Sequence, residues 1–208
     1  MEKPRLRGVI HQWAFFCALA AAGVLLAVAS TGRARVAVLI YGLTLTGLLG
    51  TSALYHRVSW QPGPRRWMRR LDHSMIFLLI AGTYTPFALL VFSEPLATVI
   101  LAVVWGGALV GVVMTLVWID APKALIAIVY VALGWVAVAG MPQMLERAGT
   151  GALVLILAGG LLYTAGAAAY AFRRPDPWPQ VFGYHEVFHV LVVAAAACHY
   201  AAIVLYVV

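Results

Sequence analysis

The sequence predicts an all-α integral membrane protein built as one seven-transmembrane helix bundle. Of its 208 residues, 64% are hydrophobic and only 10% are charged, whereas about a quarter of the residues in an ordinary soluble domain are charged. The apolar residues gather into long runs, and most basic residues fall between these runs. Composition and patterning together exclude a soluble enzyme or a soluble binding domain.

Seven runs are long enough to cross a bilayer, which takes about 20 mostly apolar residues per helix. Short segments containing charged residues separate the runs, and no solvated domain, long linker or repeat remains outside them. The chain is therefore expected to be a single membrane domain over residues 1–208, with any chemistry inside the bundle or at its edges. The expected helices cover residues 9–30, 36–56, 71–92, 96–118, 123–142, 151–172 and 185–207.

Lysine and arginine are distributed unevenly between the two sides of this bundle. Eleven of the 14 fall at the N-terminus and in the second, fourth and sixth loops, and the other three are Arg33, Arg35 and Arg147. Since cytoplasmic loops carry the excess of basic residues, the N-terminus is expected in the cytoplasm and the C-terminus outside a multi-pass cell inner (plasma) membrane. The net charge of +7 then reflects membrane topology, and no nucleic-acid partner is expected.

The first run also allows a second interpretation. It ends in Ala27-Val28-Ala29, which resembles a signal-peptidase site behind a basic N-terminus. Cleavage there would leave six helices. The apolar stretch of about 20 residues is longer than the 7–15 residues of a signal-peptide core, which favours a retained helix.

Polar side chains from three of the expected helices fall at the same cytoplasmic level. Ser52 and His56 lie at the end of the second helix, Asp72 opens the third, and His185 and His189 open the seventh. Each pair four residues apart shares one helical face. An ionisable side chain at membrane depth costs roughly 2.5 kcal/mol or more unless it is paired, metal-bound or hydrated. The sequence therefore predicts that these groups converge.

Three histidines with an open fourth position are a common ligand set for catalytic zinc. Zinc activates a bound water and polarises a carbonyl oxygen, so hydrolysis is the reaction that this pattern favours. The alternative is that the histidines are structural hydrogen-bond partners between helices. Three other histidines are set aside as ligands: His11 as an interfacial residue, His73 because it points about 100° away from Asp72, and His199 because it lies about 21 Å beyond His185.

Three segments carry a family resemblance. They read "SALYH" (residues 52–56), "RRLDHSMIFLLIAGTYTPF" (residues 69–87) and "HEVFHVLVVAAAACHY" (residues 185–200). In this order they resemble the motifs of the hemolysin III proteins, the bacterial branch of the progestin and adiponectin receptor family. The resemblance extends from the second expected helix to the seventh.

This resemblance implies that His56, His185 and His189 are the Zn²⁺ ligands, that Asp72 holds or deprotonates a zinc-bound water, and that Ser52 forms hydrogen bonds around them. The wider superfamily with this pattern includes alkaline ceramidases. The implied function is a zinc-dependent hydrolase of lipid amides or esters near the inner leaflet, with membrane lipids as partners and substrates. A cytolytic membrane-active protein and a zinc-stabilised membrane sensor or regulator without catalysis are the alternatives, and the oligomeric state is left open.

Overall fold

The computed structural model describes residues 4–208, and this range is helical apart from short connections. Lys3, one of the cations in the expected cytoplasmic cluster, lies outside the described residues. The helices, in chain order, are α1 (Val9–Val28), α2 (Gly32–Arg57), α3 (Pro62–Leu90), α4 (Leu96–Val117), α5 (Lys123–Gly134), the 3₁₀ helix η1 (Trp135–Gly140), α6 (Met141–Phe172) and α7 (Tyr184–Tyr206).

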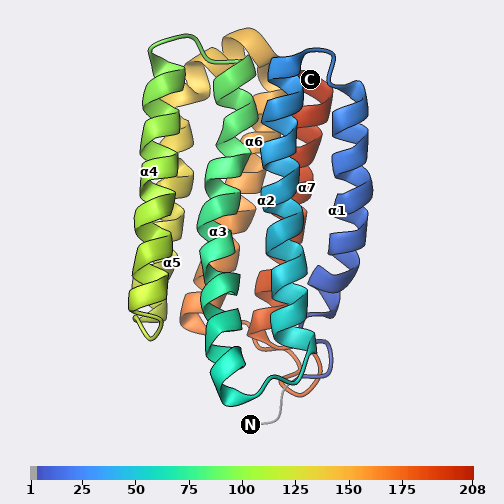
Figure 1. The fold of residues 1–208 in the computed structure, drawn as a ribbon, viewed down its shortest axis with the longest axis vertical. Helices are drawn as coiled ribbons and strands as arrows, with labels where there is room; N and C mark the ends of the chain where they lie inside the picture. Colours follow the sequence, from blue (N-terminus) through green and yellow to red (C-terminus); the bar gives the residue numbers. More distant parts are fainter. Residues whose placement is uncertain (1–3) are drawn as a thin grey trace.

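The helices lie side by side in an elongated bundle, with α1 beginning at the lower end of the view and the C-terminus at the upper end (Figure 1). The most extensive contacts join α1 to α2, α2 to α3, α3 to α4 and α6 to α7, and α7 also touches α1 and α3. Tyr41 of α2, Phe77 of α3 and Ile203 of α7 are almost completely buried. The buried core thus includes side chains of α2, α3 and α7, the helices on which the expected site residues lie.

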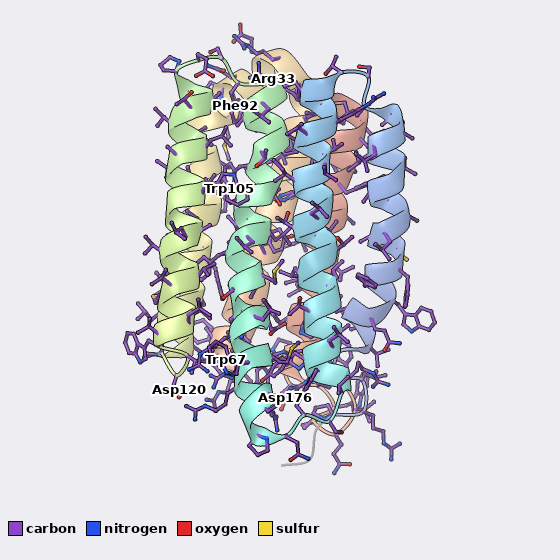
Figure 2. All side chains as sticks on the ribbon, viewed as in Figure 1. Arg33, Trp67, Phe92, Trp105, Asp120 and Asp176 are labelled. Atoms are coloured by element: carbon purple, nitrogen blue, oxygen red, sulfur yellow. The ribbon has the colours of Figure 1, made fainter. Side chains whose placement is uncertain are left out.

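The surface of the bundle suits a lipid environment. Within residues 4–208, six helical segments are long and apolar enough to cross a membrane, the fifth of them being Lys123–Phe172. Large apolar side chains face outward, among them Val110 and Val117, which are 68% and 80% exposed. Charged side chains lie toward the two ends, with Arg33 at the upper end and Asp120 at the lower end (Figure 2). The prediction of an all-helical integral membrane protein is confirmed.

The long segment Lys123–Phe172 is not one straight helix. Within α6, Gly149 has φ 86° and ψ 173°, a conformation that glycine adopts far more readily than other residues. In Figure 1 the chain rises along α5, turns at the upper end of the bundle and descends along α6. As a result α5 and α6 pack against each other.

The helix α3 begins at Pro62, earlier than the start expected at position 71. Proline is favoured in the first turn of a helix because its fixed φ suits the helix and its missing N–H is not needed there. Asp72 consequently lies roughly three turns inside α3 rather than at its first turn.

Candidate metal centre

Three histidines from two helices meet near one end of the bundle. His56 lies in the last turn of α2, and His185 and His189 lie in the first two turns of α7. The ligand atoms that they offer all lie within 4.8 Å of one another, and Nε2 of His56 is 3.2 Å from Nε2 of His185. His56 and His189 are buried, and His185 is half-buried. These three imidazoles could hold a metal ion.

Asp72 and Ser52 lie beside the histidines. Ser52 is one turn before His56 on α2 and is 3% exposed, and Asp72 on α3 is 9% exposed. The hydroxyl of Ser52 lies next to the carboxylate of Asp72. In the described part of the chain, the compact group of candidate ligand atoms consists of the three histidines without Asp72. The Asp72 carboxylate therefore lies beside the Ser52 hydroxyl, next to the three imidazoles but outside the group of candidate metal ligands.

His11 belongs to the same cluster, although the sequence interpretation set it aside. Its ring stacks on His189 with a centroid distance of 3.8 Å and an angle of 13° between the planes. Its Nδ1 lies 2.8 Å from Oγ of Ser52, at hydrogen-bond distance. Only 2% of His11 is exposed. Membrane depth could have identified His11 from the sequence, because it lies at the start of the first apolar run, at the same level as the other histidines.

The segment before α1 holds the start of α7 in place. The backbone N–H of Arg5 donates to the carbonyl of Gln180 at 3.0 Å. The guanidinium of Arg7 donates to the carboxylate of Glu186, which is completely buried. The other carboxylate oxygen of Glu186 accepts a hydrogen bond from the backbone N–H of Gly183 at 2.8 Å. Glu186, which the sequence interpretation did not single out, thus joins the N-terminal segment to the turn that carries His185.

Gly8 lets the chain pass directly over His56. It has φ 78°, in the left-handed region that favours glycine. A Cβ atom at this position would lie only 2.6 Å from Cβ of His56. A side chain here would therefore displace either α1 or the end of α2 that carries His56.

A cavity of about 160 Å³ extends from this cluster into the bundle. Its wall includes Ser52 and Asp72 near the histidines and reaches Phe92 and Met144 near the other end of the bundle. Most of the lining side chains are apolar or aromatic, which is typical of sites for small apolar ligands that carry a few polar groups. The histidines that line it are His11, His73, His185, His189 and His199.

A protein-family comparison identifies the chain. A family model described as haemolysin-III related matches residues 1–200. The chain belongs to the haemolysin III family. The resemblance read from the three sequence motifs is confirmed, and the all-helical membrane architecture is that of a haemolysin III protein.

Relatives of this haemolysin III chain occur in bacteria and animals. Hemolysin-3 of Bacillus cereus is 30% identical over 177 residues, which cover 85% of this chain and 78% of that protein. Monocyte to macrophage differentiation factor of Homo sapiens is 27% identical over 168 residues, covering 79% and 67%. The adiponectin receptor protein of Drosophila melanogaster is 33% identical over 174 residues, covering 73% of this chain but only 38% of that protein. No solved structure matches the chain.

Proposed function

We propose that this haemolysin III protein is a zinc-dependent membrane hydrolase that cleaves lipid amides or esters. One observation carries the proposal: His185, His189 and Asp72, two of the three clustered imidazoles and the buried carboxylate, line an apolar cavity inside a membrane bundle. The cavity thus offers space for an acyl chain, and its wall carries candidate metal ligands and a proton acceptor.

The spacing of the histidine nitrogens supports zinc. Nitrogen ligands lie about 2.0–2.1 Å from zinc, so two of them on one tetrahedral ion are about 3.3 Å apart. The distance between Nε2 of His56 and Nε2 of His185 is 3.2 Å. Three protein ligands leave the fourth position for water or substrate, as in catalytic sites, whereas structural sites usually have four. Zinc held by His56, His185 and His189 would supply Lewis acidity, which activates water and polarises an acyl carbonyl.

The chain's own residues supply proton transfer and orientation. Asp72 accepts the proton of the water that attacks the acyl carbon. It then returns this proton to the leaving nitrogen or oxygen as the C–N or C–O bond breaks. Ser52, next to the carboxylate, keeps it in place for this transfer. The apolar cavity wall binds the acyl chain and excludes bulk water, so that a fatty acid and an amine or alcohol are the products.

The proposed topology has seven membrane crossings, because the segment Lys123–Phe172 crosses twice. The break at Gly149 and the packing of α5 on α6 support this arrangement. The N-terminus is cytoplasmic and the C-terminus outside, in agreement with the excess of basic residues at the N-terminus and in the even-numbered loops. The metal centre then lies toward the cytoplasmic side of the inner membrane, within reach of lipids of the inner leaflet.

The test is lipid hydrolysis by the purified full-length protein. Long-chain ceramides and acyl esters of matched chain length are incubated with the protein, and fatty-acid release is followed by mass spectrometry. We expect release that stops after zinc is removed with a chelator and returns when zinc is added back. A protein that holds zinc and releases fatty acid from neither class would contradict the hydrolase and leave the zinc-stabilised sensor.

The names of the Bacillus relatives support a second candidate function, membrane permeabilisation. The protein of Bacillus cereus is named hemolysin-3 and that of Bacillus subtilis a hemolysin-3 homolog. Leakage of a dye from liposomes at low protein density separates the two candidates. If the protein permeabilises membranes, leakage should persist when His56, His185 and His189 are replaced by alanine. If it is a hydrolase, fatty-acid release should depend on these three residues.

A further inference from the structure

A buried histidine stands apart from the metal centre on the wall of the same cavity. His199 lies on α7, ten residues after His189, which is about 15 Å further along the helix axis. It is 9% exposed and lines the cavity together with Ile156 and Tyr163 of α6. The ring centroids of His199 and Tyr163 are 5.5 Å apart. The proposed hydrolase chemistry does not use this imidazole.

The hydrogen bond of His199 determines which ring nitrogen is available to a ligand. Its Nε2 lies 3.3 Å from the carbonyl oxygen of Ile156. A carbonyl oxygen only accepts, so Nε2 carries the proton and donates it. In a neutral imidazole Nδ1 then has a lone pair and no proton. This Nδ1 is buried and has no hydrogen-bond partner among the described residues.

The position of the ring is built into the fold. A Cβ atom on Gly159 of α6 would lie 2.3 Å from both Cδ2 and Nε2 of His199. Only glycine at position 159 leaves room for the imidazole to approach the α6 backbone and reach the Ile156 carbonyl. The unpartnered Nδ1 is therefore held in a defined place beside the cavity.

We propose that Nδ1 of His199 accepts a hydrogen bond from a hydroxyl group partway along a lipid acyl chain in the cavity. The inference rests on the proposed function in one respect, because it takes the cavity as the acyl-chain site with the carbonyl at the metal centre. The N–H of a lipid amide lies next to that carbonyl, about 15 Å from His199, so it is too far away to be the donor. His199 is thus a specificity-determining residue for chains hydroxylated at mid-length.

The test is a positional scan with free fatty acids as probes on the full-length protein. Binding of octadecanoic acid and of its hydroxy derivatives, with the hydroxyl moved along the chain, is measured by displacement of a fluorescent fatty acid. We expect one mid-chain position to bind about 3- to 10-fold more tightly than octadecanoic acid, the range for one neutral hydrogen bond. His199→Phe should remove this preference, so that the hydroxylated probes bind this variant no more tightly than octadecanoic acid does.

Thr83→Val is the matched control. Thr83 also lines the cavity, but its hydroxyl already donates to the Leu79 carbonyl of its own helix at 2.8 Å. This variant should keep the preference. Equal binding of all probes, or a preference that survives in His199→Phe, would overturn only the role of His199. Failure of every probe to bind would also overturn the role of the cavity as the acyl-chain site. Equal binding of all probes to the wild-type protein overturns the role of His199 even where His199→Phe does not fold.

Discussion

Threonines in the helices and the polar residues of the metal centre are satisfied in two different ways. Threonines on α2, α3, α4 and α6 donate to a carbonyl one turn back on their own helix. At the metal centre, His11 bonds to Ser52 and His56 approaches His185, so that the contacts cross between helices. The own-helix donors are Thr44, Thr46, Thr83, Thr85, Thr115 and Thr164.

These two bonding patterns differ in how strongly they depend on the packing of the helices. A hydroxyl bonded to its own helix is satisfied wherever that helix packs. A contact between helices forms only when the helices pack in one register, and an ionisable group left alone at membrane depth is expensive. Substitutions at the metal centre should therefore have larger consequences than substitutions of equally buried threonines.

The largest effect is expected for Asp72→Asn. The amide keeps the size of the side chain but cannot take a proton from water, so fatty-acid release should fall by roughly 10²- to 10⁴-fold. The zinc content should stay that of the wild type, because the carboxylate is outside the group of candidate ligand atoms. Asp120→Asn, an exposed control paired with Arg69, should change neither quantity. Wild-type turnover in Asp72→Asn would remove the proton-transfer role.

Arg7→Met should destabilise the protein next most strongly. It leaves the carboxylate of Glu186 buried without its guanidinium partner, which costs about 3 kcal/mol when a buried pair is broken. The matched control is Arg69→Met, since Arg69 pairs with Asp120 at the surface, where such a pair contributes about 0–1 kcal/mol. Thermal denaturation in detergent compares the two variants. Equal losses would show that the N-terminal segment does not hold α7.

His11→Phe should have a smaller effect, confined to the metal centre. Phenylalanine keeps a flat ring against His189 but cannot bond to Ser52. Loss of such a supporting hydrogen bond lowers metal affinity or activity by about tenfold at the low end of its range. The measurement is zinc affinity and fatty-acid release in the same preparation. His11→Gln, which keeps a polar group, should recover part of the loss, and wild-type behaviour of His11→Phe would make His11 a packing residue only.

The smallest effect is expected for Thr115→Val. The hydroxyl of Thr115 is buried and donates to the Gly111 carbonyl of α4 at 2.9 Å. Its removal should change stability by about 1 kcal/mol or less and leave fatty-acid release unchanged. Ser52→Ala removes one hydroxyl of similar burial but should lower release, because Ser52 contacts His11 and Asp72. If Thr115→Val and Ser52→Ala change fatty-acid release equally, the metal centre does not differ in this respect from the threonines bonded to their own helices.

The helical membrane architecture could be predicted because a bilayer leaves few choices. Backbone groups in hydrocarbon must be satisfied within the segment, so long apolar runs become helices. The ends of the helices were harder to predict, as the start of α3 at Pro62 shows. Proline and arginine in residues 57–70 read as a loop, whereas most of this stretch forms the first turns of α3.

The histidine cluster was accessible from the sequence because depth and a spacing of four residues locate His56, His185 and His189 without knowledge of packing. The roles of Asp72 and Ser52 stay predictions. His11 and Glu186 were missed because their partners depend on how α1 and the N-terminal segment dock on α7, which no periodicity encodes. The cavity and the free Nδ1 of His199 likewise arise only from the packing of α3, α6 and α7.

The metal centre is tested most simply by the zinc content of the purified protein, measured by elemental analysis in the wild type, His185→Ala and Asp72→Ala. We expect one zinc per chain in the wild type, none in His185→Ala, and wild-type content in Asp72→Ala. Equal zinc content in the wild type and His185→Ala would contradict this expectation, because the three imidazoles would then be structural partners and not a metal centre.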